Sequence, residues 1–95
     1  MVDPDLHHIL IYSYVADMAT LREPHRSAHL ARIIAQRDTG HIYLAGGFDP
    51  PTGGAIVFRG VDRDHVEAFV ASDPYYINGL VTAYRIERWN LLRGH

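Results

Sequence analysis

Histidines are the residues best suited to chemistry in this sequence, because only imidazole changes charge near neutral pH at its unperturbed pKa. The chain has seven histidines in 95 residues. One of them, His29, lies in the stretch Arg26-Ser27-Ala28-His29-Leu30. Histidine is the side chain that enzymes use most often for proton transfer, so His29 is a candidate general base.

Asp73, in the stretch Ser72-Asp73-Pro74-Tyr75, is the candidate partner of His29. An aspartate held against an imidazole orients the ring and stabilises its protonated form. Asp-Pro is also a common helix-stop and turn dipeptide, and the sequence leaves this alternative open. The two residues are far apart along the chain, so only the fold can bring them together.

Arg26 lies one helical turn before His29 and could hold a substrate carboxylate or phenolate through paired hydrogen bonds. The alternative for Arg26 is a surface ion pair with Glu23. Gly46 and Gly47 could let a ligand approach the backbone closely. Aromatic walls for a small ligand, or ordinary core packing, are offered by Tyr12, Tyr14, Phe48, Tyr75 and Tyr76. We predict that the substrate-binding residues are Arg26, Tyr12, Gly46 and Tyr75.

His25 and His29 are four residues apart, a spacing at which two imidazoles on one helix can share a metal ion. No glutamate or cysteine completes a recognisable ligand set, so we predict no metal site and no cofactor. The chain has no cysteine, which excludes disulfides and thiol nucleophiles. The remaining histidines are predicted to be surface residues: His7, His8, His41, His65 and His95.

The elements that must position these side chains follow from apolar periodicity and turn residues. Strands are predicted over 7–14, 41–45, 55–59 and 80–89, and helices over 25–39 and from the N-cap Asp62 to the residue before Asp73. Gly46 and Gly47 are expected to interrupt the second strand. In the first helix, Leu30, Ile33, Ile34 and Arg37 share one stripe.

The order strand-helix-strand-strand-helix-strand is that of the ferredoxin-like split βαβ fold, in the α+β class. It predicts a four-stranded antiparallel sheet with two helices on one face. The other face would be apolar and uncovered in a monomer. We therefore expect two sheets to pair in a homodimer, because burying apolar surface stabilises an assembly.

Composition bounds the class of protein and its partners. The chain is 47% hydrophobic and 21% charged, which is typical of a globular protein, and its length predicts a single domain, residues 1–95. A net charge of −2 argues against a nucleic-acid partner. The arginines at positions 22, 26, 32 and 37 alternate with apolar residues and are predicted to form an ordinary solvated helix face.

No apolar run approaches the roughly 18 residues of a membrane span, and the acidic N-terminal stretch is unlike a signal peptide, so we expect a cytoplasmic location and no membrane partner.

The chain resembles the YCII-related domain family over about residues 7–91. The resemblance rests on short segments in a fixed order: Arg26-Ser27-Ala28-His29-Leu30-Ala31, Leu44-Ala45-Gly46, Gly53-Gly54, Ser72-Asp73-Pro74-Tyr75, and Gly79-Leu80-Val81 leading to Trp89-Asn90. It implies a dimeric α+β barrel and a pocket whose His-Asp pair acts in acid/base chemistry. These roles carry over to His29 and Asp73, with Arg26 as a secondary site residue. The family often has a proline where this chain has Gly47, which implies a differently shaped pocket wall.

The resulting hypothesis is a cofactor-independent enzyme that performs isomerisation, elimination or lyase-type chemistry on a small cyclic or aromatic molecule. The resemblance supports this substrate class, since some members are associated with the breakdown of small, sometimes chlorinated, aromatics. One alternative is a non-catalytic module for small-molecule binding or dimerisation. Another is a cofactorless monooxygenase, which rests on fold analogy alone.

Overall fold

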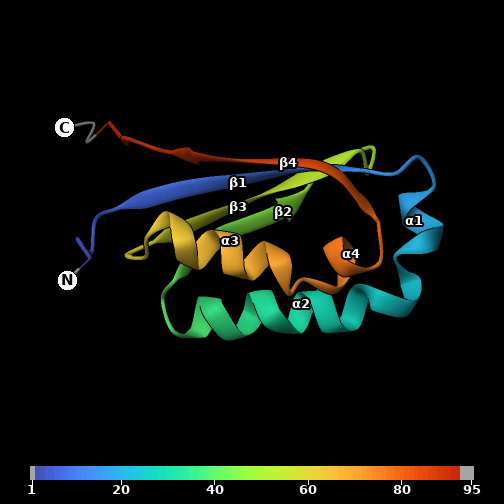
Figure 1. The fold of residues 1–95 in the computed structure, drawn as a ribbon, viewed down its shortest axis with the longest axis horizontal. Helices are drawn as coiled ribbons and strands as arrows, with labels where there is room; N and C mark the ends of the chain where they lie inside the picture. The colour runs from blue at the N-terminus through green and yellow to red at the C-terminus, as the bar shows by residue number, and fades with distance from the viewer. Residues whose placement is uncertain (1, 93–95) are drawn as a thin grey trace.

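A computed structural model describes residues 2–92 of the chain. The strands are β1 (His7–Tyr14), β2 (Ile42–Gly47), β3 (Gly53–Arg59) and β4 (Val81–Arg88), and the helices are α1 (Met18–Leu21), α2 (Glu23–Asp38), α3 (Arg63–Ala71) and α4 (Pro74–Ile77). The strands form one antiparallel sheet in the order β2-β3-β1-β4, and the helices lie on one side of it (Figure 1). This is the predicted α+β, ferredoxin-like arrangement, with α1 and α4 as additional short helices. None of the helices within residues 2–92 is both long and apolar enough to span a membrane.

β1 is one of the two inner strands of the sheet, because it pairs with β3 on one side and with β4 on the other. Successive side chains of a strand point to opposite faces of the sheet. Leu10 and Tyr12 therefore point towards the helices, where both are buried. Ile9 and Ile11 point to the opposite face, which no helix covers, and they remain half-buried.

β2 corrects one prediction, because the strand continues through Gly46 and Gly47. Their partners on β3 are Ala55 and Gly54, and the irregularity in the pairing lies earlier in the strand, between Ile42 and Leu44. Glycine is a poor strand former on its own. Here the backbone hydrogen bonds of β3 outweigh that preference.

Two of the histidines predicted to be at the surface, His7 and His8, are only 5% and 6% exposed. The prediction fails because the start of this strand is covered on both faces. His8 points towards the helices, on the same face as Leu10, and on the other face the His7 ring contacts Tyr43 and lies 2.8 Å from the Asp5 carbonyl oxygen. His41 and His65 are half-buried, with their ring centroids 5.3 Å apart. His95 lies outside the described residues.

α3 supplies the helical side of the core. Asp62 caps it as predicted, since its carboxylate accepts a hydrogen bond from the backbone N–H of His65. Val66, Phe69 and Val70 are buried against the sheet. The core cluster that they complete contains Leu10, Tyr12, Ile42, Ile56, Phe58, Val61 and Ile86.

α2 begins at Glu23, with Pro24 in its first turn, and ends before Gly40, whose φ of +85° suits glycine. Although it is much longer than α3, its single buried residue is His29. Leu30 and Ile34, on the stripe predicted from the sequence, remain 40% and 44% exposed. The apolar stripe of α2 thus faces a space that the sheet does not fill.

Candidate active site

Asp73 is the most deeply buried polar residue of the site, with none of its surface exposed. It precedes Pro74 and caps α4, where its Oδ1 accepts a hydrogen bond of 3.1 Å from the backbone N–H of Tyr75. The helix-stop role that its sequence suggested is therefore real. A second role is compatible with it, because each carboxylate oxygen can accept more than one hydrogen bond.

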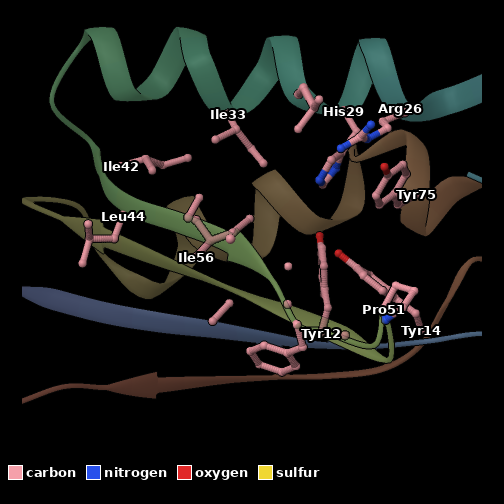
Figure 2. A pocket seen from close by; sticks show the side chains of 18 of the residues that line it. Tyr12, Tyr14, Arg26, His29, Ile33, Ile42, Leu44, Pro51, Ile56 and Tyr75 are labelled. Carbon is pink, nitrogen blue, oxygen red and sulfur yellow. The ribbon is translucent and has the colours of Figure 1, made fainter. Parts of the chain in front are cut away.

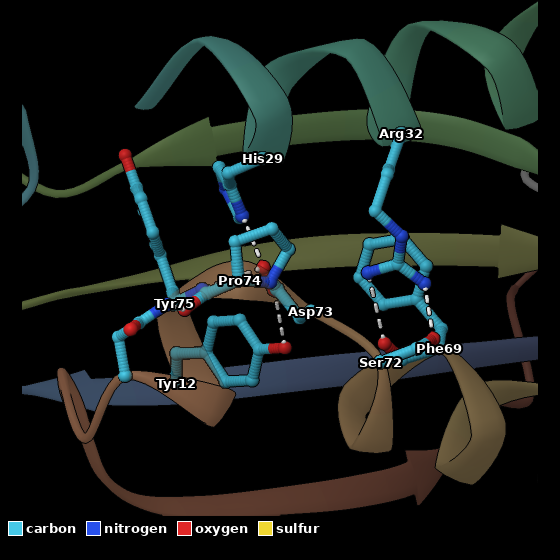
Figure 3. Close-up of polar contacts among 9 residues, drawn as sticks. Tyr12, His29, Arg32, Phe69, Ser72, Asp73, Pro74 and Tyr75 are labelled. Atoms are coloured by element: carbon cyan, nitrogen blue, oxygen red, sulfur yellow. Dashed lines mark hydrogen bonds and ion pairs between the residues drawn. The ribbon is translucent and has the colours of Figure 1, made fainter. Parts of the chain in front are cut away.

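Two further side chains converge on this carboxylate (Figure 3). The Tyr12 hydroxyl donates to Asp73 Oδ2 over 2.7 Å, and His29 Nδ1 lies 2.8 Å from Asp73 Oδ1. As a carboxylate, Asp73 accepts from all of these groups, and His29 then carries its proton on Nδ1. That tautomer leaves Nε2 with a free lone pair.

The His29 ring is held in place by stacking as well as by its hydrogen bond. The Tyr75 ring lies parallel to it, with centroids 3.7 Å apart and planes inclined by 7°. Tyr75 lies in the first turn of α4, directly after Pro74, and the N-cap Asp73 fixes the position of this turn. The same aspartate therefore places both rings of the stack. The imidazole is therefore fixed by Asp73 at one nitrogen and by Tyr75 on one face.

His29 forms part of the wall of a pocket of about 520 Å³ between α2 on one side and β2 and β3 on the other. This volume is within the range of small-molecule sites. Figure 2 shows the His29 ring projecting from α2 towards the hydroxyl ends of Tyr12 and Tyr14. Ile33 and Ile56 add apolar wall. The remainder of the wall is formed by Arg22, Arg26, Leu30, Ile34, Arg37, Tyr75, the stretch 42–48, Pro51 and 53–55.

The predicted site residues therefore gather in one place. Tyr12, Arg26, His29, Gly46 and Tyr75 all line this pocket. Asp73 is not on the wall and lies behind His29, which it contacts through Nδ1. Among residues 2–92, no group of three or more histidine, aspartate or glutamate side chains is arranged to hold a metal ion.

Tyr12 and Tyr14 face the pocket as neutral hydroxyls. Burial and the adjacent Asp73 carboxylate raise the pKa of Tyr12 far above its ordinary value. Burial, with smaller effects from Tyr75 and Asp73, also raises the pKa of Tyr14. Protonated phenols donate hydrogen bonds and do not act as bases, so of these side chains His29 is the one suited to accept a proton near neutral pH.

Glycines shape the floor of the pocket in two different ways. At Gly54 an added Cβ would lie 2.9 Å from the carbonyl oxygen of Gly46 and 3.3 Å from the Tyr14 hydroxyl, so the fold itself requires glycine there. At Gly46 an added Cβ would meet no protein atom within 4 Å. Any steric need for glycine at position 46 would therefore come from a ligand.

Arg32 is a positioning residue that its sequence context does not reveal, because the arginine pattern of this helix predicts a solvated face. It donates hydrogen bonds to the Phe69 carbonyl at 3.1 Å and to the Ser72 hydroxyl at 2.6 Å (Figure 3). Its guanidinium also lies over the Phe69 ring, 4.4 Å from the centroid. Arg32 follows His29 by three residues on the same helix face, and Ser72 precedes Asp73. This tie therefore holds α2 against the segment that carries Asp73.

The model of the YCII-related domain matches residues 6–90 of the chain. The chain belongs to this family. No curated protein matches the sequence. Among solved structures, this YCII-related chain is similar to 5-chloro-2-hydroxyhydroquinone dehydrochlorinase from Burkholderia phenoliruptrix AC1100, in complex with 2,5-dihydroxybenzoquinone. The two are 24% identical, the match covers 88% of this chain and 93% of the other, and the TM-score is 0.77. This likeness shows that the two proteins share their fold.

Proposed function

We propose that this YCII-related protein is a cofactor-independent enzyme in which His29 is the general base. The observation that carries the proposal is the 2.8 Å contact between His29 Nδ1 and the fully buried Asp73, with His29 on the pocket wall. Asp73 would orient the ring and stabilise the imidazolium that forms when Nε2 takes a proton. Positioned proton transfer of this kind typically contributes about 10²–10⁴-fold to a rate.

The reaction that we infer is an elimination or an isomerisation started by removal of a proton. In an elimination, His29 Nε2 takes a proton from a C–H or O–H group of the substrate. The electron pair left behind forms a new π bond, and the leaving group departs with the electron pair of its own bond. In an isomerisation, the imidazolium returns the proton to another atom of the same molecule. Both sequences use only groups that the protein supplies.

We infer a small cyclic or aromatic substrate. The aromatic and aliphatic side chains of the wall, among them Tyr12, Tyr14, Ile33 and Ile56, support a flat apolar ligand. The name of the Burkholderia protein, a dehydrochlorinase of a chlorinated hydroquinone, supports the same class and an elimination. Arg26 would bind an anionic group of this substrate, and Gly46 would admit its ring beside the backbone of β2.

Chloride release tests the proposal directly, with 5-chloro-2-hydroxyhydroquinone as the first substrate and a chelator present. The wild type should release chloride, and His29→Gln should lower the rate at least about 10²-fold. The matched control is His25→Gln, which removes a half-buried histidine one turn earlier on α2 that does not line the pocket. Equal rates for wild type and His29→Gln would refute the role of His29. Tight binding of this compound without conversion would favour a non-catalytic binding module.

We also propose that the protein pairs with a second copy through the face of the sheet that no helix covers. Ile9 and Ile11 on β1 lie beside Val57 and Ala55 on β3, so this face has an apolar centre. Charged residues of β4, such as Arg85 and Glu87, form its edge. Sedimentation should show a dimer for the wild type and a folded monomer for Ile11→Asp. A wild-type monomer at micromolar concentration would exclude this pairing.

A further inference from the structure

Two arginines lie at the start of α2. Arg22 is the N-cap residue of α2, and Arg26 follows one turn later; both line the pocket. Within residues 2–92, neither makes an ion pair or a hydrogen bond through its guanidinium. The surface ion pair of Arg26 with Glu23, which the sequence left open, is not formed there. Two charged donors are thus available at the His29 end of the pocket.

A third donor lies beside them, the hydroxyl group of Tyr75. Tyr75 is only 3% exposed and lines the pocket, yet its hydroxyl has no hydrogen-bond partner in the described part of the chain. Figure 2 shows this hydroxyl next to Arg26 and close to the His29 ring. Burial raises the pKa of Tyr75, while the charges of Arg22 and Arg26 oppose that rise, as expected for guanidinium groups close to the hydroxyl.

Negative charge around this cluster is sparse. No aspartate or glutamate lines the pocket within the described chain. Asp73 is turned towards His29 and Tyr12, and Glu23 affects Tyr75 less than either arginine does. Arg22 is half-buried and Arg26 is exposed at the mouth of the pocket, whereas Tyr75 is buried. A cluster of charged and neutral donors without a counter-charge favours an anion.

We propose that the substrate of this pocket is an organic anion whose carboxylate or phenolate oxygen binds between Arg22, Arg26 and the Tyr75 hydroxyl. The ring of the substrate would extend from this point along Ile33 and Ile56. Because Tyr75 stacks on His29, the bound oxygen lies beside the imidazole, and the neighbouring substrate atoms come within reach of Nε2. The inference rests on the proposed function in taking this pocket as the substrate site.

Arg37 provides an internal control for this assignment. It lines the same pocket on the same helix, eleven residues after Arg26. At 1.5 Å per residue, this places the two positions about 16 Å apart along α2. Arg37→Gln removes the same charge from the pocket as Arg26→Gln but leaves the cluster at His29 intact, so it separates a specific site from general attraction.

The test is calorimetric titration with 2,5-dihydroxybenzoate and with its neutral amide, which has nearly the same shape. The wild type should bind the carboxylate at least about tenfold more tightly than the amide. Arg22→Gln and Arg26→Gln should each remove most of this preference, and Arg37→Gln should change it less than about threefold. Tyr75→Phe, which keeps the stacking ring, should weaken binding of the carboxylate severalfold and leave the amide unchanged.

Equal affinity for the acid and the amide in the wild type would overturn the inference, and so would undetectable binding of the acid. An Arg37→Gln loss as large as that of Arg26→Gln would also overturn it, by showing that only the summed charge matters. The titrations need no turnover and can be repeated in His29→Gln. A preference for the acid in a wild type that releases no chloride from 5-chloro-2-hydroxyhydroquinone would count against the proposed function while supporting the anion site.

Discussion

The two long helices lie on the same side of the sheet but differ in how many side chains they bury against it. α3 has nine residues and buries Val66, Phe69 and Val70 in the core. α2 has sixteen residues and buries His29 alone. Between α2 and the strands β2 and β3 lies the pocket of about 520 Å³. The region under α3 is a packed core, which we call the packed half. The region between α2 and the strands β2 and β3 contains the pocket, and we call it the hollow half.

The difference shows how a small fold can keep a cavity open. α3 is held by apolar contacts, which fill space. α2 packs on the core through the half-buried Ile33 and is also held by polar contacts of single side chains: His29 to Asp73, and Arg32 to Phe69 and Ser72. Such ties fix the position of a helix without requiring its apolar stripe to be covered. The residues that position α2 are thus also those that build the candidate active site.

The largest effect is expected where the two halves meet, at Asp73. With a chloride-releasing substrate, Asp73→Asn should reduce kcat by about 10²–10⁴-fold, since an amide does not hold His29 in the required tautomer or stabilise its cation. The buried site keeps its volume, so we expect the variant to fold. A kcat within threefold of the wild type, in a variant with native circular dichroism, would mean that Asp73 serves only to cap α4.

The next prediction compares the loss of stability caused by a truncation in the packed half with that caused by a truncation in the hollow half. Phe69→Ala should cost about 3–5 kcal/mol of unfolding free energy, because it leaves a cavity beneath α3. Leu30→Ala should cost less than about 1 kcal/mol, because that side chain is 40% exposed over the pocket. Urea unfolding of both variants measures the difference. Similar losses would show that α2 packs as tightly as α3.

Tyr12 and Tyr14 allow a comparison inside the pocket. Tyr12→Phe removes a buried hydrogen bond to Asp73 and should cost about 1–3 kcal/mol, since Oδ2 loses its donor. Tyr14 makes no side-chain hydrogen bond within the described residues, so Tyr14→Phe should change stability by less than about 0.5 kcal/mol. Thermal unfolding of the two variants side by side gives the answer. The reverse order would show that Tyr12 is not tied to Asp73.

The smallest effect concerns His8, in the packed half. Its Nδ1 is buried without a hydrogen-bond partner in the described structure, and burial lowers the pKa of His8 from the ordinary value of 6.5. The unfolded chain then binds more protons than the folded one below pH 6.5, so this residue costs stability as the pH falls through that value. His8→Gln should flatten the fall in stability between about pH 7 and pH 5. If the variant loses stability with falling pH as steeply as the wild type does, other residues cause this pH dependence.

Much of the fold could be predicted from the sequence because its signals are local. A run of strand-forming residues identified β1, and Asp62 and Asp73-Pro74 marked the limits of α3. The misses occur where tertiary contacts override local preference. β2 continues through Gly46 and Gly47 on the hydrogen bonds of β3, and contacts on the two faces of the sheet bury His7 and His8.

For the site, residue types and the family resemblance identified the pocket residues, but not the contacts between them. That His29 and Asp73 meet depends on the packing of α2 against α4 and its N-cap Asp73, which no spacing along the chain encodes. Arg32 was missed for the same reason, since an arginine on an amphipathic helix gives no local sign of a partner on another helix. The α2 stripe was predicted correctly, but its periodicity alone could not show that it faces a cavity.

The most direct test of the account is the protonation pattern of His29, read from long-range ¹H–¹⁵N correlations of the histidine rings at neutral pH. The account predicts that neutral His29 carries its proton on Nδ1, and that its Nε2 signal moves when 2,5-dihydroxybenzoquinone is added. Asp73→Asn should disturb this pattern, and His25→Gln should leave it intact. A proton on Nε2, or an Nε2 signal indifferent to a ligand bound in the pocket, would contradict the role of His29 as a base held by Asp73.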